Sequence, residues 1–83
     1  MAIAIDKRKV RGVVLACNEL LKANEFGYGD AIIGLSELIG RIIVDKSGTS
    51  IQAEELRQVV IDHITATINA GAEAAGKVVV ARA

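Results

Sequence analysis

The sequence predicts an all-α domain of three helices, and three observations support this fold class. Apolar residues recur at helical spacing in three segments, glycine-containing connections separate those segments, and the chain contains no proline. The expected helices cover residues 6–24, 31–46 and 51–75. Because 83 residues fit one domain better than two, we expect a single helical domain over residues 1–83.

Composition limits how that domain is stabilised. Hydrophobic residues make up 52% of the chain but aromatic residues only 2%, so Ile, Val, Leu and Ala must supply any core. A domain of this size buries only roughly 60–65% of the surface that its unfolded chain exposes. Regular packing or association of subunits is therefore expected to supply the remaining stability.

The first expected helix, residues 6–24, is a one-sided surface helix. Asp6 is its candidate N-cap, because a short acidic side chain accepts hydrogen bonds from the free N–H groups of a first turn. Its apolar residues follow the i, i+3, i+4, i+7 pattern of one helix face: Val10, Val13, Val14, Cys17, Leu20 and Leu21.

The connection over residues 25–30 carries both aromatic residues of the chain, Phe26 and Tyr28. Gly27 is a candidate for the left-handed conformation that closes a helix. Asp30 is then the expected N-cap of the second helix. Because tyrosines are common anchors at binding surfaces, Phe26 and Tyr28 are candidate partner-binding residues.

The second expected helix, residues 31–46, is far more apolar than the first. On a helical wheel its apolar residues occupy a sector of roughly 240°, which two surface helices of one small domain do not easily cover. Ser36 and Gly40 lie four residues apart in this sector, where small side chains let another backbone approach. We therefore predict a subunit interface formed by Ile32, Leu35, Ser36, Leu38, Ile39, Gly40, Ile42 and Ile43. The alternative is a buried central helix in a three-helix monomer.

The third expected helix, residues 51–75, follows a connection with capping chemistry. Gly48 fits a C-cap position, and Thr49 and Gln52 have capping-box spacing, with Ser50 as the competing N-cap. The main apolar stripe is Leu56, Val59, Val60, Ile64 and Ile68. The opposite, polar face is Glu54, Gln58, Asp62, Thr65 and Asn69.

Both ends of the chain have strand-like composition. Residues 2–5 alternate between Ala and Ile, and residues 78–80 are three consecutive valines, which favour a pleated environment. A short terminal β-ribbon is one expectation, although an isolated two-stranded ribbon is marginal. Helix extension and disorder are the alternatives.

The residues that carry chemistry are too few for a recognisable site. Cys17 and His63 are the only residues of their types, so a zinc site lacks ligands and Cys17 has no partner for an internal disulfide. The carboxylates form no acid–base pair by spacing. We expect no catalytic residues, no metal and no cofactor, and we expect His63 to lie at the edge of the third helix's apolar stripe as a candidate partner contact.

A basic stripe on the first helix offers a second class of partner. Arg8, Arg11 and Lys22 share its exposed face, where they are candidate contacts for phosphates. The second expected helix, the connection and the third expected helix loosely resemble the order of a helix-turn-helix, in which Ser50, Gln52, Ala53 and Arg57 would face the major groove. Lys plus Arg equal Asp plus Glu at 10 each, which argues against a dedicated nucleic-acid binder.

These patterns predict a small non-enzymatic binding protein. We expect an adaptor, inhibitor or structural accessory protein that is a homo-oligomer, most simply a dimer, with a further protein partner; a nucleic-acid-binding regulator is the alternative. Such size and composition are also typical of accessory proteins encoded by phages and mobile elements. No apolar run reaches the ~20 residues that a membrane span needs, and no secretion signal is visible, so we expect a cytoplasmic protein without a membrane contact.

Overall fold

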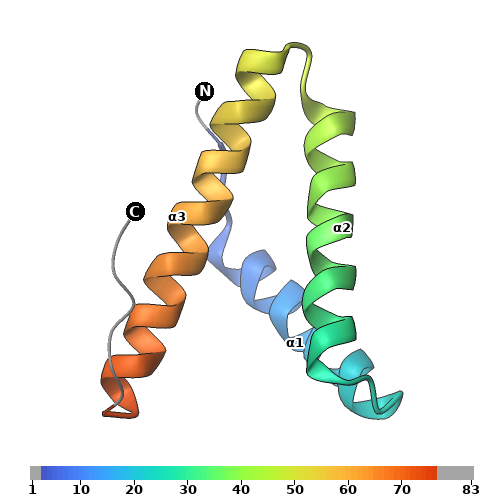
Figure 1. Cartoon of the computed structure of the whole chain (residues 1–83), viewed down its shortest axis with the longest axis vertical. Coiled ribbons are helices and arrows are strands. Elements are labelled where there is room, and N and C mark those ends of the chain that lie inside the picture. The colour runs from blue at the N-terminus through green and yellow to red at the C-terminus, as the bar shows by residue number, and fades with distance from the viewer. Residues whose placement is uncertain (1–2, 77–83) are drawn as a thin grey trace. The chain divides into compact units, whose positions relative to one another are not determined.

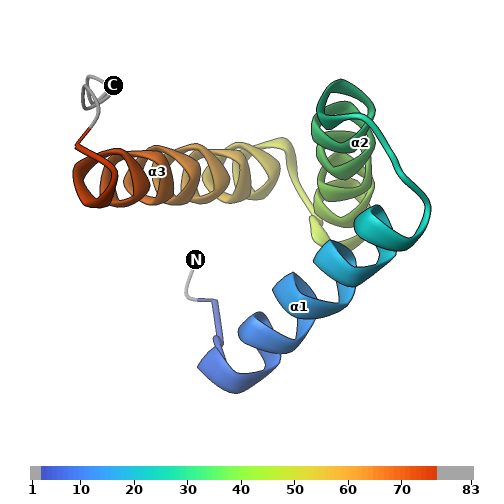
Figure 2. The ribbon, with the colours of Figure 1, turned by 90° about the horizontal axis from the view of Figure 1, so that it is seen from below.

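The computed structural model describes residues 3–76, and this part of the chain contains three α-helices (Figure 1). α1 spans Lys7–Ala23, α2 spans Tyr28–Lys46 and α3 spans Ser50–Ala74. Each helix is a continuous coil in both views (Figure 1, Figure 2). The all-α fold class is confirmed. Residues 3–6 form no strand, and the valines of the expected β-ribbon, residues 78–80, lie outside the described residues.

The start of α1 confirms the predicted cap. The Asp6 carboxylate accepts hydrogen bonds from the backbone N–H groups of Arg8, at 3.0 Å, and Lys9, at 3.4 Å. These two donors have no partner within the helix itself, and Asp6 satisfies them from an extended backbone conformation. The negative charge also faces the positive end of the helix dipole.

The end of α1 differs from the prediction, because Glu25 and not Gly27 takes the left-handed conformation. Glu25 has φ 53°, and the backbone N–H groups of Glu25 and Phe26 each donate at 3.3 Å, to the carbonyls of Lys22 and Leu21 respectively. This pair of bonds defines a Schellman motif, which normally favours glycine at the left-handed position. The left-handed residue therefore lies two positions before the glycine, and α1 ends at Ala23.

The start of α2 also differs from the prediction. The carbonyl of Gly27 accepts a hydrogen bond from the backbone N–H of Ala31 at 3.0 Å, so the helix begins at Tyr28, three residues early. Asp30, the expected N-cap, instead lies within the first turn. There its charge still complements the helix dipole, although its side chain does not cap the helix.

The start of α3 confirms the predicted use of Thr49 and Gln52. The Thr49 hydroxyl accepts from the backbone N–H of Gln52 at 3.1 Å, and the Gln52 side-chain oxygen accepts from the backbone N–H of Gly48 at 2.7 Å. The return bond thus reaches one residue beyond the cap residue of a standard capping box. Gly48, expected at a C-cap, is not among the residues with positive φ.

The chain divides into two units, Met1–Ile42 and Ile43–Ala83. The first contains α1 and most of α2, and the second contains the last turn of α2 and all of α3. Among the described residues, no hydrophobic side chain is buried, and Asn69 is the one buried residue. Neither unit therefore encloses a hydrophobic core of its own within residues 3–76. The expected single-domain organisation stays a prediction.

Candidate interaction surface

The apolar surface of α2 is the most distinctive feature of the described chain. Leu35, at 38%, is the least exposed of its six exposed large aliphatic side chains, which are Ile32, Ile33, Leu35, Leu38, Ile42 and Val44. Ile39 and Ile43 are half-buried. The broad apolar sector predicted for this helix is therefore exposed within the described residues. Burying such a side chain fully contributes about 1.5–3 kcal/mol.

Two small residues lie within this surface. The Ser36 hydroxyl donates to the carbonyl of Ile32 at 2.7 Å, so its polar group is satisfied inside the helix. A Cβ placed on Gly40 would meet nothing within 4 Å. Because no atom of the described residues occupies the space beside it, Gly40 leaves room for a second backbone. Its role in an interface stays a prediction.

A narrow polar strip completes the circumference of α2. Glu37 and Arg41 form an ion pair one turn apart at 3.4 Å, and Asp45 pairs with Lys46 at 3.6 Å. All four side chains are exposed, so these pairs contribute little to the free energy of folding. Glu37, Arg41 and Asp45, spaced four residues apart, mark the side of the helix that faces water.

The aromatic residues next to α2 are accessible, as a partner-binding role requires. Tyr28 is 87% exposed at the first position of α2, and Phe26 is 52% exposed in the preceding connection. Phe26 also provides one of the two backbone N–H groups that close α1. The end of the connection and the first residue of α2 therefore present the two rings next to each other in the sequence.

The predicted basic residues and His63 are exposed, but they lie on two different helices. Arg8, Arg11 and Lys22 all belong to α1, with Lys22 in its last turn. His63 is exposed on α3, in the other unit, and its carbonyl accepts a hydrogen bond from the Thr67 hydroxyl at 2.8 Å. Within residues 3–76, no group of three or more His, Cys, Asp or Glu side chains is placed to hold a metal ion.

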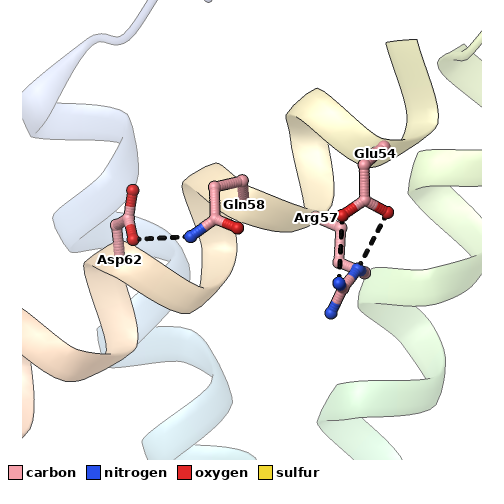
Figure 3. A network of polar contacts seen from close by, with 4 residues as sticks. All are labelled: Glu54, Arg57, Gln58 and Asp62. Atoms are coloured by element: carbon pink, nitrogen blue, oxygen red, sulfur yellow. Dashed lines mark hydrogen bonds and ion pairs between the residues drawn. The ribbon is translucent and has the colours of Figure 1, made fainter. Parts of the chain in front are cut away.

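Polar side chains on the exposed face of α3 contact one another within the helix (Figure 3). The Arg57 guanidinium donates two hydrogen bonds to the Glu54 carboxylate, at 3.1 and 3.0 Å. These bonds, and then the attraction between the charges, lower the pKa of Glu54 and raise the pKa of Arg57. The Gln58 amide donates to Asp62 at 2.9 Å, as its i,i+4 spacing predicts. Arg57 and Gln52, two of the expected groove contacts, thus already bind residues of their own chain.

Asn69 is the residue that sequence reasoning misplaced. We expected it on the polar face of α3, yet it is 5% exposed, and neither its amide nitrogen nor its amide oxygen has a hydrogen-bond partner in the described structure. A buried amide without partners costs about 1–3 kcal/mol. The polar residues of this face, such as Thr65 one turn before Asn69, do not indicate that Asn69 is buried.

An open depression lies at the start of α1. It is lined by Ala4, Ile5, Asp6, Lys9, Val10 and Val13. The Asp6 carboxylate there is already occupied by the N-terminal N–H groups of α1. The depression therefore lacks the convergent free polar groups typical of a small-molecule site.

Comparison with known proteins gives no guide to this surface. Searches against protein-family models, curated proteins and solved structures each found no match. Among the described helices, none has both the length and the apolar character that crossing a bilayer demands.

Proposed function

We propose that the protein is a small non-enzymatic binding protein that acts as a homo-oligomer, most simply a dimer, through the apolar surface of α2. One observation carries this proposal: neither unit buries a hydrophobic side chain within residues 3–76, while α2 leaves its large aliphatic side chains exposed. Hydrophobic burial is the main favourable term in folding and in association. In any solution of this protein, a second copy of the chain is available to cover the apolar surface of α2.

The charge balance supports the same proposal. The chain carries 10 basic and 10 acidic residues, so two copies approach each other without net repulsion. A net charge near zero also favours association in general. The proposed interface comprises Ile32, Leu35, Ser36, Leu38, Ile39, Gly40, Ile42 and Ile43.

A further protein partner would bind outside that interface. Phe26 and Tyr28 support this role, since both rings are exposed next to the start of α2. Their place suits an adaptor, an inhibitor or a structural accessory protein of the kind that phages and mobile elements encode. We propose a cytoplasmic location, since a single cysteine leaves no internal disulfide to stabilise a secreted domain of this size.

Nucleic-acid binding is the second candidate function. The exposed side chains of Arg8, Arg11 and Lys22 on α1 support it. The contacts of Arg57 with Glu54 weigh against a groove-binding role for α3, since a phosphate or base would have to displace a carboxylate. The first candidate therefore has the stronger support.

The test of the proposed function uses the full chain and an Ile39→Glu variant. Light scattering of the wild type should give more than one chain per particle at micromolar concentration. Because Ile39 is half-buried on the proposed interface, the variant should be monomeric while circular dichroism still shows a helical chain. A wild-type monomer would overturn the proposal. An unfolded Ile39→Glu monomer would show instead that Ile39 packs inside its own chain.

A further inference from the structure

A regular seam runs along the exposed surface of α2. Six residues follow the alternating spacing of four and three that keeps side chains on one line of a helix: Tyr28, Ile32, Leu35, Ile39, Ile42 and Lys46. This is the spacing of a seven-residue repeat, the pattern by which two helices pack along each other. Five of the six are exposed and Ile39 is half-buried, so the seam is open along the whole helix.

The seam reads the same from both ends. Glu37 is its midpoint, and the seam positions lie in pairs at equal distances from it, with Leu35 and Ile39 as the inner pair. Ile32 and Ile42 form the next pair, and the outer pair is Tyr28 with Lys46, at the two ends of α2. A twofold axis through the level of Glu37 therefore brings each member of a pair opposite the other member on a second helix.

The outer pair decides the direction of the second helix. In a parallel arrangement each Lys46 would lie beside the Lys46 of the second copy, and the two ammonium groups would repel. In an antiparallel arrangement each Lys46 lies beside a Tyr28, where its aliphatic stem can pack on the ring while its ammonium group keeps its 3.6 Å pair with Asp45. Antiparallel helices also align their dipoles favourably.

We propose that two copies of this chain pair through α2 in an antiparallel arrangement, with Glu37 at the level of the twofold axis. Ile32 then packs against Ile42 of the second copy, and Leu35 packs against Ile39 of the second copy. Ser36, Leu38 and Ile43 lie on either side of this seam, and Gly40 lies further round the helix from the seam than Ser36 does. The inference rests on the proposed function, because it specifies the geometry of the same self-association.

Spin-label distances test this register in the full chain. In a Cys17→Ser background, single variants Asp30→Cys, Glu37→Cys and Val44→Cys place one label on each chain at exposed positions off the seam, seven residues apart on one face of α2. At about 1.5 Å per residue, labels at positions 30 and 44 should each be displaced from their copies by about 21 Å along the antiparallel helices. Labels at position 37 should show no such displacement.

Because positions 30, 37 and 44 share one face of the helix, their lateral separations match, and the label-to-label distance at position 37 should be roughly 10 Å shorter than at either end. Equal distances at all three positions in a dimer would establish a parallel pair, which overturns the inference and leaves the proposed function standing. Absence of any interchain distance, with monomeric light scattering, would overturn both.

Disulfide cross-linking gives an independent reading of the same geometry. In the Cys17→Ser background, Ile32→Cys and Ile42→Cys are made separately. The antiparallel pair predicts cross-linked dimers when the two variants are mixed and refolded together, and few when either is oxidised alone, because a disulfide requires Cα atoms within about 7 Å. The reverse pattern, with cross-links in each variant alone, would overturn the inference.

Discussion

Neighbouring isoleucines on α2 provide a matched test of the proposed interface. Ile32 lies on the seam and is 59% exposed, whereas Ile33 is about 100° further round the helix and is 70% exposed. Within a single chain both side chains are mostly in water, and glutamate is a slightly better helix former than isoleucine. Neither Ile32→Glu nor Ile33→Glu should therefore unfold α2.

The effect on the dimer is expected to differ strongly. Covering the exposed part of Ile32 contributes roughly 1–2 kcal/mol per copy, since full burial of such a side chain contributes about 1.5–3 kcal/mol. Both copies lose this contribution in Ile32→Glu, so the dimer weakens by about 2–4 kcal/mol, which raises the dissociation constant roughly 30- to 700-fold. Desolvation of the new carboxylate increases this loss.

Sedimentation velocity over a range of concentrations measures both dissociation constants, with circular dichroism as the control for helicity. Tyr28 is the only tyrosine and the chain has no tryptophan, so its fluorescence gives a second signal at the end of the seam. Ile33→Glu should dimerise about as well as the wild type. Equal weakening by the two substitutions, or no effect of Ile32→Glu, would refute the assignment of the interface to the seam.

Two further predictions concern the end of α1 and the alternative function. Glu25→Gly should raise the free energy of unfolding by about 0.5–1 kcal/mol, because glycine adopts the φ of 53° without the steric cost of a Cβ. The control Asn24→Gly changes a residue at φ −102° and should lower the free energy of unfolding, because it removes the 2.8 Å hydrogen bond from the Asn24 side chain to the carbonyl of Leu20. Urea denaturation of both variants checks this, and destabilisation by Glu25→Gly would contradict the cap that we describe. If the protein binds nucleic acid, its affinity for a duplex should fall steeply with salt and weaken in an Arg8→Ala/Arg11→Ala variant. We instead expect a fluorescence anisotropy titration of the wild type to show no such salt-dependent binding.

Local hydrogen-bonding signals in the sequence predicted the starts of α1 and α3 best, whereas α2 begins three residues before its predicted start. Asp6 and Thr49 cap α1 and α3 as expected, because a cap depends on residues within three positions of it. The end of α1 was less predictable. Gly27 carried the obvious signal, but two backbone bonds at Glu25 and Phe26 close the helix first.

Burial was not predictable in the same way. The sequence indicated the breadth of the apolar surface of α2, because the period of the apolar residues is a local property. The burial of Asn69 depends on which groups surround it, and its neighbours in the sequence carry no information about them. The candidate interface was therefore predictable as a helix face, whereas its partner was not, since covering that face is a property of the assembled protein.

The most direct test of the central claim, that a second copy covers α2, is the mass of the wild-type particle in solution. Sedimentation equilibrium of the full chain across a range of micromolar concentrations measures it without labels or substitutions. We predict twice the mass of one chain, falling toward the mass of one chain on dilution. The mass of a single chain at every concentration, with the helices intact, would contradict the claim.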